Sequence, residues 1–102
     1  MSSAESLFHE IAANIPQTTE GKMFGALCIK ALNGKPGVMF WKDALVFKLP
    51  GDALQQALEL EGAHIFEPSP GKKMGGWVQL SLQHQARWKE LAHQSMELVG
   101  SL

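Results

Sequence analysis

Lysines are the side chains of this sequence best suited to binding chemistry, because many of them share one stretch of the chain. Residues 22–48 hold five lysines and a single acid, Asp43, so this stretch has a net charge of +4 while the whole chain has −1. Two more lysines stand in the glycine-rich segment 71–76, whose backbone amides could also contact an anion. The candidate nucleic-acid-binding residues are Lys30, Lys35, Lys42, Lys48, Lys72 and Lys73. Their contact with phosphates would be weak and salt-sensitive; the alternative is that they are solvated residues of sheet edges and flexible turns.

Three aromatic residues accompany these lysines and could offer stacking surfaces to nucleic-acid bases. They are Phe24, Trp41 and Trp77. A chain with no possible intrachain disulfide depends on its aromatic and aliphatic residues for a core. We therefore expect all three rings to belong to the core.

Residues that could catalyse a reaction or hold a metal ion are scattered along the chain. The histidines are His9, His64, His84 and His93. None is two, three or four residues from another, and the chain has no Cys-x-x-Cys pair, so we predict no metal site and no cofactor. Cys28 alternates with Leu27 and Ile29, a pattern typical of a small buried hydrophobe. We expect no catalytic residue, and an enzyme that depends on Cys28 or His64 is the hypothesis with least support.

Length and composition limit the class of protein. The chain has 102 residues, of which 45% are hydrophobic, so it fits a single domain over residues 1–102 and is not disordered. Its one cysteine excludes an intrachain disulfide. No apolar run approaches the roughly 18 residues of a membrane helix, and the N-terminus lacks the positive region of a secretory signal. These features predict a cytoplasmic protein that does not contact membranes.

Hydropathy patterns predict the elements that must position the lysines. Helices are predicted over residues 4–15, before Pro16, over 52–61 with Asp52 as N-cap, and over 81–99 with Ser81 as N-cap. Strands are predicted over residues 21–31, 38–42, 44–49, 63–67 and 77–80. Short connections favour an antiparallel meander for the first three strands and a short second hairpin for the last two. The expected fold class is α+β, with this antiparallel sheet packed against an N-terminal helix, a short middle helix and a long C-terminal helix.

The order of several short motifs resembles the N-terminal domain of the TfoX (Sxy) family, which is related to the YjbR/CyaY-like group. The motifs are Lys22-Met23-Phe24-Gly25, Asn33-Gly34-Lys35, Leu45-Val46-Phe47-Lys48-Leu49, Met74-Gly75-Gly76-Trp77 and a C-terminal helix bearing Trp88. The resemblance covers about Lys22 to Val99. It implies a compact α+β domain, a regulatory role linked to competence for DNA uptake and no catalytic residues. In the related group it implies DNA contact through the sheet and wing-like hairpins.

Two functions of different classes follow from these observations. The first is a non-enzymatic binding or regulatory domain that contacts nucleic acid, or a protein partner, through the basic meander. The alternative is a protein-interaction or small-molecule-binding domain that acts as a homodimer, because an open antiparallel sheet has exposed edges that could pair with a second copy.

Overall fold

The computed structural model describes residues 3–102 and contains one sheet of six strands, paired antiparallel in the order β1-β2-β3-β4-β6-β5. The strands are β1 (Thr18–Met23), β2 (Ala26–Ala31), β3 (Pro36–Trp41), β4 (Ala44–Lys48), β5 (His64–Ile65) and β6 (Trp77–Ser81). The helices are α1 (Ser3–Ala13), α2 (Gly51–Leu58) and α3 (Gln85–Gly100). The predicted α+β class is confirmed, with a meander, a short second hairpin and three helices.

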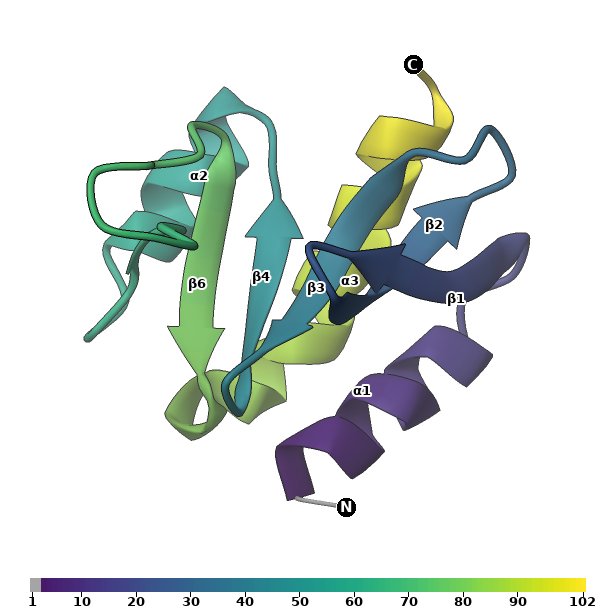
Figure 1. Ribbon diagram of the computed structural model, residues 1–102, viewed down its shortest axis with the longest axis horizontal. Coiled ribbons are helices and arrows are strands. Elements are labelled where there is room, and N and C mark those ends of the chain that lie inside the picture. The colour runs from purple at the N-terminus through teal and green to yellow at the C-terminus, as the bar shows by residue number, and fades with distance from the viewer. Residues whose placement is uncertain (1–2) are drawn as a thin grey trace.

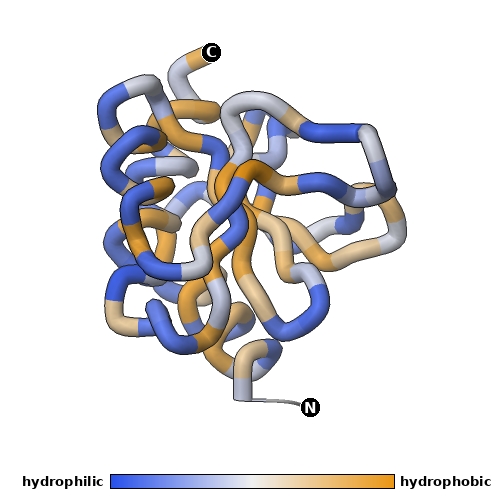
Figure 2. The backbone as a smooth tube through the Cα atoms, turned by 90° about the vertical axis from the view of Figure 1, so that its left-hand side faces the viewer, coloured by the Kyte–Doolittle hydropathy of each residue, from blue (hydrophilic) through white to orange (hydrophobic). Residues whose placement is uncertain are grey.

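The three helices pack against one face of the sheet and enclose the main core (Figure 1). α3 contacts β2, β3 and β4, α1 contacts β1, and α2 contacts β6. The largest side chains buried in this core are Trp88, Phe8, Phe47, Ile29, Leu45 and Leu80. Figure 2 shows hydrophobic backbone segments gathered toward the middle of the molecule, where helices and strands meet. No helix within residues 3–102 is long and apolar enough to span a membrane.

The opposite face of the sheet, called here the free face, carries a second and smaller core. Its buried members are Cys28, Met39, Val46, Phe66 and Trp77. Residues 66–76, called here the cover loop, fold over this face and bring Phe66 and Met74 onto it. The Met74 N–H donates to the Phe66 carbonyl oxygen at 2.8 Å, and the Phe66 N–H donates to the Trp77 carbonyl oxygen at 2.8 Å. These bonds hold both ends of the loop against the start of β6.

The single strand predicted over residues 21–31 is wrong, because the chain reverses direction within it. Phe24 and Gly25 have φ values of 56° and 78° and form a two-residue hairpin tip between β1 and β2. Positive φ at both central positions is the geometry of a type I′ turn, whose twist matches that of the paired strands. The meander therefore has four strands, and Gly25 belongs to the turn between the first two.

Both predicted helix caps are also wrong. Pro50 is the N-cap of α2 and makes no side-chain cap bond, while Asp52 lies in the first turn, where its carboxylate favourably faces the helix dipole. Ser81 ends β6 and is the N-cap of a 3-10 turn over Leu82–His84, with no side-chain cap bond, whereas His84 is the N-cap of α3. His84 Nε2 lies 2.6 Å from the Glu61 carbonyl oxygen, which ties this turn to the segment after α2.

Candidate nucleic-acid interface

Strand register places Lys30 and Lys48 on the free face. Lys48 pairs with Trp77 of the second core, and its ammonium lies 6.0 Å from the centre of the Trp77 ring. The Lys30 side chain lies across Gly21, where a Cβ atom would come within 3.0 Å of the Lys30 Cε atom. Both lysines are half-buried, so their aliphatic stems cover apolar surface while their charged ends reach solvent.

An open hollow of about 520 Å³ lies between the cover loop and the hairpin tips. We call it the Trp41 hollow; it is lined by Phe24, Trp41, Pro68, Ser69, Lys72, Lys73 and Met74. Its lining is mostly apolar, two lysines belong to it, and no acidic residue lines it. A third ammonium, that of Lys42, lies 5.7 Å from the centre of the Trp41 ring. The hollow thus presents aromatic surface and positive charge together.

A turn within the cover loop determines where Lys72 and Lys73 lie. The Lys72 N–H donates to the Ser69 carbonyl oxygen at 2.9 Å, and Gly71 has a φ of 79° that favours glycine. The Gly71 N–H donates to a Glu67 carboxylate oxygen at 2.7 Å. The Glu67 carboxylate, which is the nearest in the sequence to the two lysines, therefore accepts a hydrogen bond that helps to form the turn.

Two strained hairpin tips stand at the same end of the sheet as this hollow. Phe24 at the first tip, and Lys42 and Asp43 at the second, all have positive φ, between 48° and 63°. A left-handed conformation costs a residue with a Cβ atom about 1–2 kcal/mol. Phe24 bears this cost while its side chain remains 62% exposed, so burial of the ring does not offset the strain.

The expectation that all three aromatic rings belong to the core is correct for Trp77, holds in part for Trp41, which packs against the second core, and is wrong for Phe24. Trp77 is buried, whereas Trp41 is half-buried and Phe24 is exposed. The Trp41 ring meets Phe66 edge-on, with centroids 5.2 Å apart, which leaves part of the ring facing the hollow. Phe24 is exposed because it sits at a hairpin tip, a position that the predicted continuous strand did not contain.

Lys35 lies apart from the other candidate lysines. It belongs to the turn between β2 and β3, at the end of the sheet opposite the two strained tips. Its backbone N–H donates to Asn33 Oδ1 at 2.9 Å, and Asn33 Nδ2 donates to the Val99 carbonyl oxygen at 2.9 Å. The structure therefore brings Lys72 and Lys73 to the Trp41 hollow, places Lys42 over the Trp41 ring and Lys30 and Lys48 on the same face, and separates Lys35.

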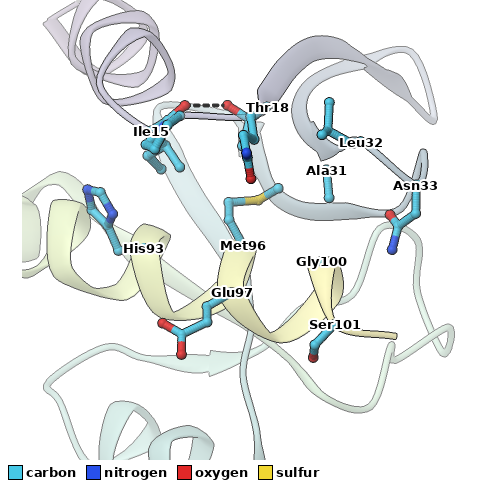
Figure 3. A pocket seen from close by; sticks show the side chains of 12 residues that line it. Ile15, Thr18, Ala31, Leu32, Asn33, His93, Met96, Glu97, Gly100 and Ser101 are labelled. Carbon is cyan, nitrogen blue, oxygen red and sulfur yellow. Dashed lines mark hydrogen bonds between the residues drawn. The ribbon is translucent and has the colours of Figure 1, made fainter.

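A second hollow, of about 480 Å³, lies between the end of α1, the β2–β3 turn and the end of α3 (Figure 3). Two of its polar groups are already bonded inside the protein, because Thr18 Oγ1 donates to the Ile15 carbonyl oxygen and Asn33 Nδ2 donates to Val99. Its lining includes the Glu97 carboxylate and the His93 imidazole, but no lysine or arginine. This hollow therefore suits an anion less well than the Trp41 hollow.

The two residues that the sequence offered for catalysis are Cys28 and His64. Cys28 is fully buried, and burial raises the pKa of its thiol. His64 is exposed, with Nδ1 3.1 Å from the Gly62 carbonyl oxygen. Across residues 3–102, no three His, Cys, Asp or Glu side chains gather where they could hold a metal ion.

Comparison with family models finds none that matches this chain, and neither a curated protein nor a solved structure gives a match. The resemblance to the TfoX N-terminal domain therefore stays a prediction. The functional conclusion depends on the surface itself.

Proposed function

We propose that this chain is a small, non-enzymatic binding and regulatory domain that makes weak, salt-dependent contact with nucleic acid through the free face of its sheet. One observation carries the proposal: Lys72 and Lys73 stand around the same hollow as Phe24 and Trp41. Ammonium groups neutralise phosphates, and aromatic rings stack on bases, so this pairing of residue types matches the two chemical parts of a nucleotide.

The distribution of charge supports the same orientation of the domain. Lys30 and Lys48 lie on the free face, and Lys42 stands over Trp41 beside it. Outside residues 22–48 the chain has a net charge of −5, and much of that negative charge lies on or next to the helices. A polyanion would therefore meet its most favourable potential at the free face, although the net charge of the chain is close to zero.

The second candidate function is a homodimeric interaction domain that pairs through β1. This strand is an edge strand of six residues, with one side unpaired in the sheet. If two copies paired antiparallel about Gly21, Glu20 of each would lie opposite Lys22 of the other, which is a favourable cross-strand pair. Light scattering at high protein concentration tests this function, and a monomer at all concentrations would exclude it.

The nucleic-acid function is tested by an NMR amide-shift titration with a short mixed-sequence DNA duplex, and with one of its separated strands, at about 20 mM and about 200 mM salt. We expect shifts at Lys42, Lys72 and Lys73 that are strong at low salt and weak at high salt. The proposal fails if neither form of DNA produces shifts at either salt concentration.

A pair of charge-reversal variants separates a specific surface from general electrostatics. K72E/K73E removes the lysines at the hollow, and K35E/K89E makes the same change of charge at two exposed lysines elsewhere. We expect the first variant to abolish the shifts and the second to preserve most of them. Equal losses in both variants would mean that net charge, rather than this surface, attracts the DNA.

A further inference from the structure

We infer that the Trp41 hollow receives an unpaired base, so that the nucleic acid this domain prefers is a single strand rather than a duplex. This inference deepens the proposed function and rests on it. Phe24, Trp41, Pro68 and Met74 give the hollow an apolar lining, to which the two lysines also belong. A duplex presents phosphates to a protein but keeps the faces of its bases within the stack, so duplex contact would leave this apolar surface uncovered.

The size of the hollow fits the inference. Its volume of about 520 Å³ is enough for one or two bases with part of the adjoining sugar. The exposed part of Trp41 and the 62% exposed ring of Phe24 are the flat surfaces on which a base can stack. Bases of any sequence have such a face, so binding through stacking is tolerant of sequence.

The lysines on and beside the free face extend over a longer distance than a single bound nucleotide would contact. Lys72 and Lys73 line the hollow and Lys42 lies over the Trp41 ring, whereas Lys30 and Lys48 lie on the same face toward the other end of the sheet. A free nucleotide would use only the charges at the hollow. A strand whose base occupies the hollow would also bring neighbouring phosphates over the free face, and this favours a strand as the occupant.

Backbone strain beside the hollow is a second, independent observation. Phe24 keeps a φ of 56° although glycine or asparagine would adopt this conformation at less cost. Strained residues cluster at ligand sites, and here the strained residue contributes an aromatic ring to the lining of the hollow. The inference is thus that Phe24 is retained for binding at the expense of stability.

Substituting Phe24 with asparagine should change binding and stability in opposite directions. F24N creates an Asn-Gly tip, the preferred sequence for a type I′ turn, so the fold is expected to be at least as stable as that of the wild type. The matched control is L32N, which removes a 74% exposed apolar side chain from the turn at the opposite end of the sheet. Thermal unfolding of both variants verifies that any loss of binding is not a loss of folding.

The experiment measures fluorescence anisotropy of a labelled oligothymidylate of about 10 nucleotides, and of the same strand in a duplex with oligoadenylate. We expect the single strand to bind about tenfold or more tightly than the duplex. We expect F24N to lose about tenfold in affinity for the single strand, equivalent to about 1.4 kcal/mol, while L32N binds like the wild type. Binding should quench tryptophan fluorescence through Trp41, because Trp77 and Trp88 are buried, and W41F should lose this quenching.

Four results would overturn the inference. Duplex binding equal to or tighter than single-strand binding would remove the preference for unpaired bases but leave the proposed function standing. Unchanged affinity in F24N would show that the hollow is not used. If thymidine monophosphate competed as well as the oligothymidylate at equal molar concentration, the occupant of the hollow would be a free nucleotide rather than a strand. Absence of binding to both forms of DNA would overturn the proposed function together with the inference.

Discussion

Gly37 of β3 and Met96 of α3 lie in direct contact, so that a Cβ atom on Gly37 would come within 2.8 Å of the Met96 sulfur. The same Cβ atom would lie 3.1 Å from the Ser95 carbonyl oxygen, which belongs to the helix backbone. The missing side chain therefore allows α3 to approach the sheet closely. This approach buries the stripe of α3 that faces the main core.

Substituting Gly37 with alanine should destabilise the fold. The Met96 side chain can shift, but the Ser95 backbone cannot move without displacing α3, so we expect a loss of about 1–3 kcal/mol in the free energy of unfolding. Urea denaturation measures this loss. The matched control is G75A, because a Cβ atom there meets nothing within 4 Å, and its effect should stay within about 0.5 kcal/mol. Equal stability of the two variants would contradict the close packing.

The buried Trp88 indole supports a second prediction. Trp88 is fully buried in the main core, so W88A should cost about 3–5 kcal/mol of unfolding free energy in chemical denaturation. Its Nε1 atom is buried without a hydrogen-bond partner among residues 3–102. W88F removes this unsatisfied donor as well as part of the ring, so it should cost less than half as much as W88A. A loss below about 1 kcal/mol for W88A would show that the indole is not a core residue.

The contact between α1 and β1 should depend on pH. His9 Nδ1 lies 2.9 Å from a Glu20 carboxylate oxygen, and His9 Nε2 lies 3.6 Å from Glu5. The hydrogen bond to Glu20 is the main cause that raises the pKa of His9 above 6.5. A raised pKa in the folded state means that this contribution to stability is fully present below the unfolded pKa and is lost as pH rises through the folded pKa.

Unfolding free energies measured between about pH 5 and about pH 8 test this dependence. The stability difference between the wild type and H9Q should be larger at the acidic end and should shrink as the pH rises. E20Q should show the same trend, and the double variant H9Q/E20Q should be little worse than either single one. A difference that does not vary with pH would mean that protonated His9 adds nothing to the fold.

The reactivity of Cys28 provides a fourth prediction. Its thiol is fully buried in the second core, and burial raises its pKa, so little thiolate is available to a reagent. Labelling by a disulfide reagent should be slow in the native protein and fast in denaturant. Fast labelling of the native protein would reopen the hypothesis of an enzyme that depends on Cys28.

Much of the fold was predictable from local sequence. The stripe of Trp88, Leu91 and Val99 has the spacing of one helix face, and the structure buries it against the sheet. Asn33-Gly34 predicts a turn, and Gly34 has a φ of 85° there. In each case the physical cause acts over a few neighbouring residues, so the pattern is visible in the sequence.

The hairpin tip at Phe24 was not predictable in the same way. Residues 23–29 are apolar or glycine, and this run continues through the tip as though one strand, mostly apolar on both faces, ran from 21 to 31. A bulky aromatic residue also disfavours positive φ, so the local preference of Phe24 is against the turn that it occupies. Pairing of β1 with β2 along their whole length outweighs that preference.

The amino-acid sequence by itself determined the α+β class, the burial of Cys28 and the concentration of lysines in residues 22–48. Tertiary structure alone decided which lysines share a surface. Lys35 and Lys42 are close in the sequence, but each strand of a meander reverses the chain, so successive turns stand at opposite ends of the sheet. The Trp41 hollow joins Phe24 with residues 68–74, more than forty positions away, because the cover loop folds back over the free face. Such an encounter depends on strand order and long-range packing, which no local pattern of residues encodes.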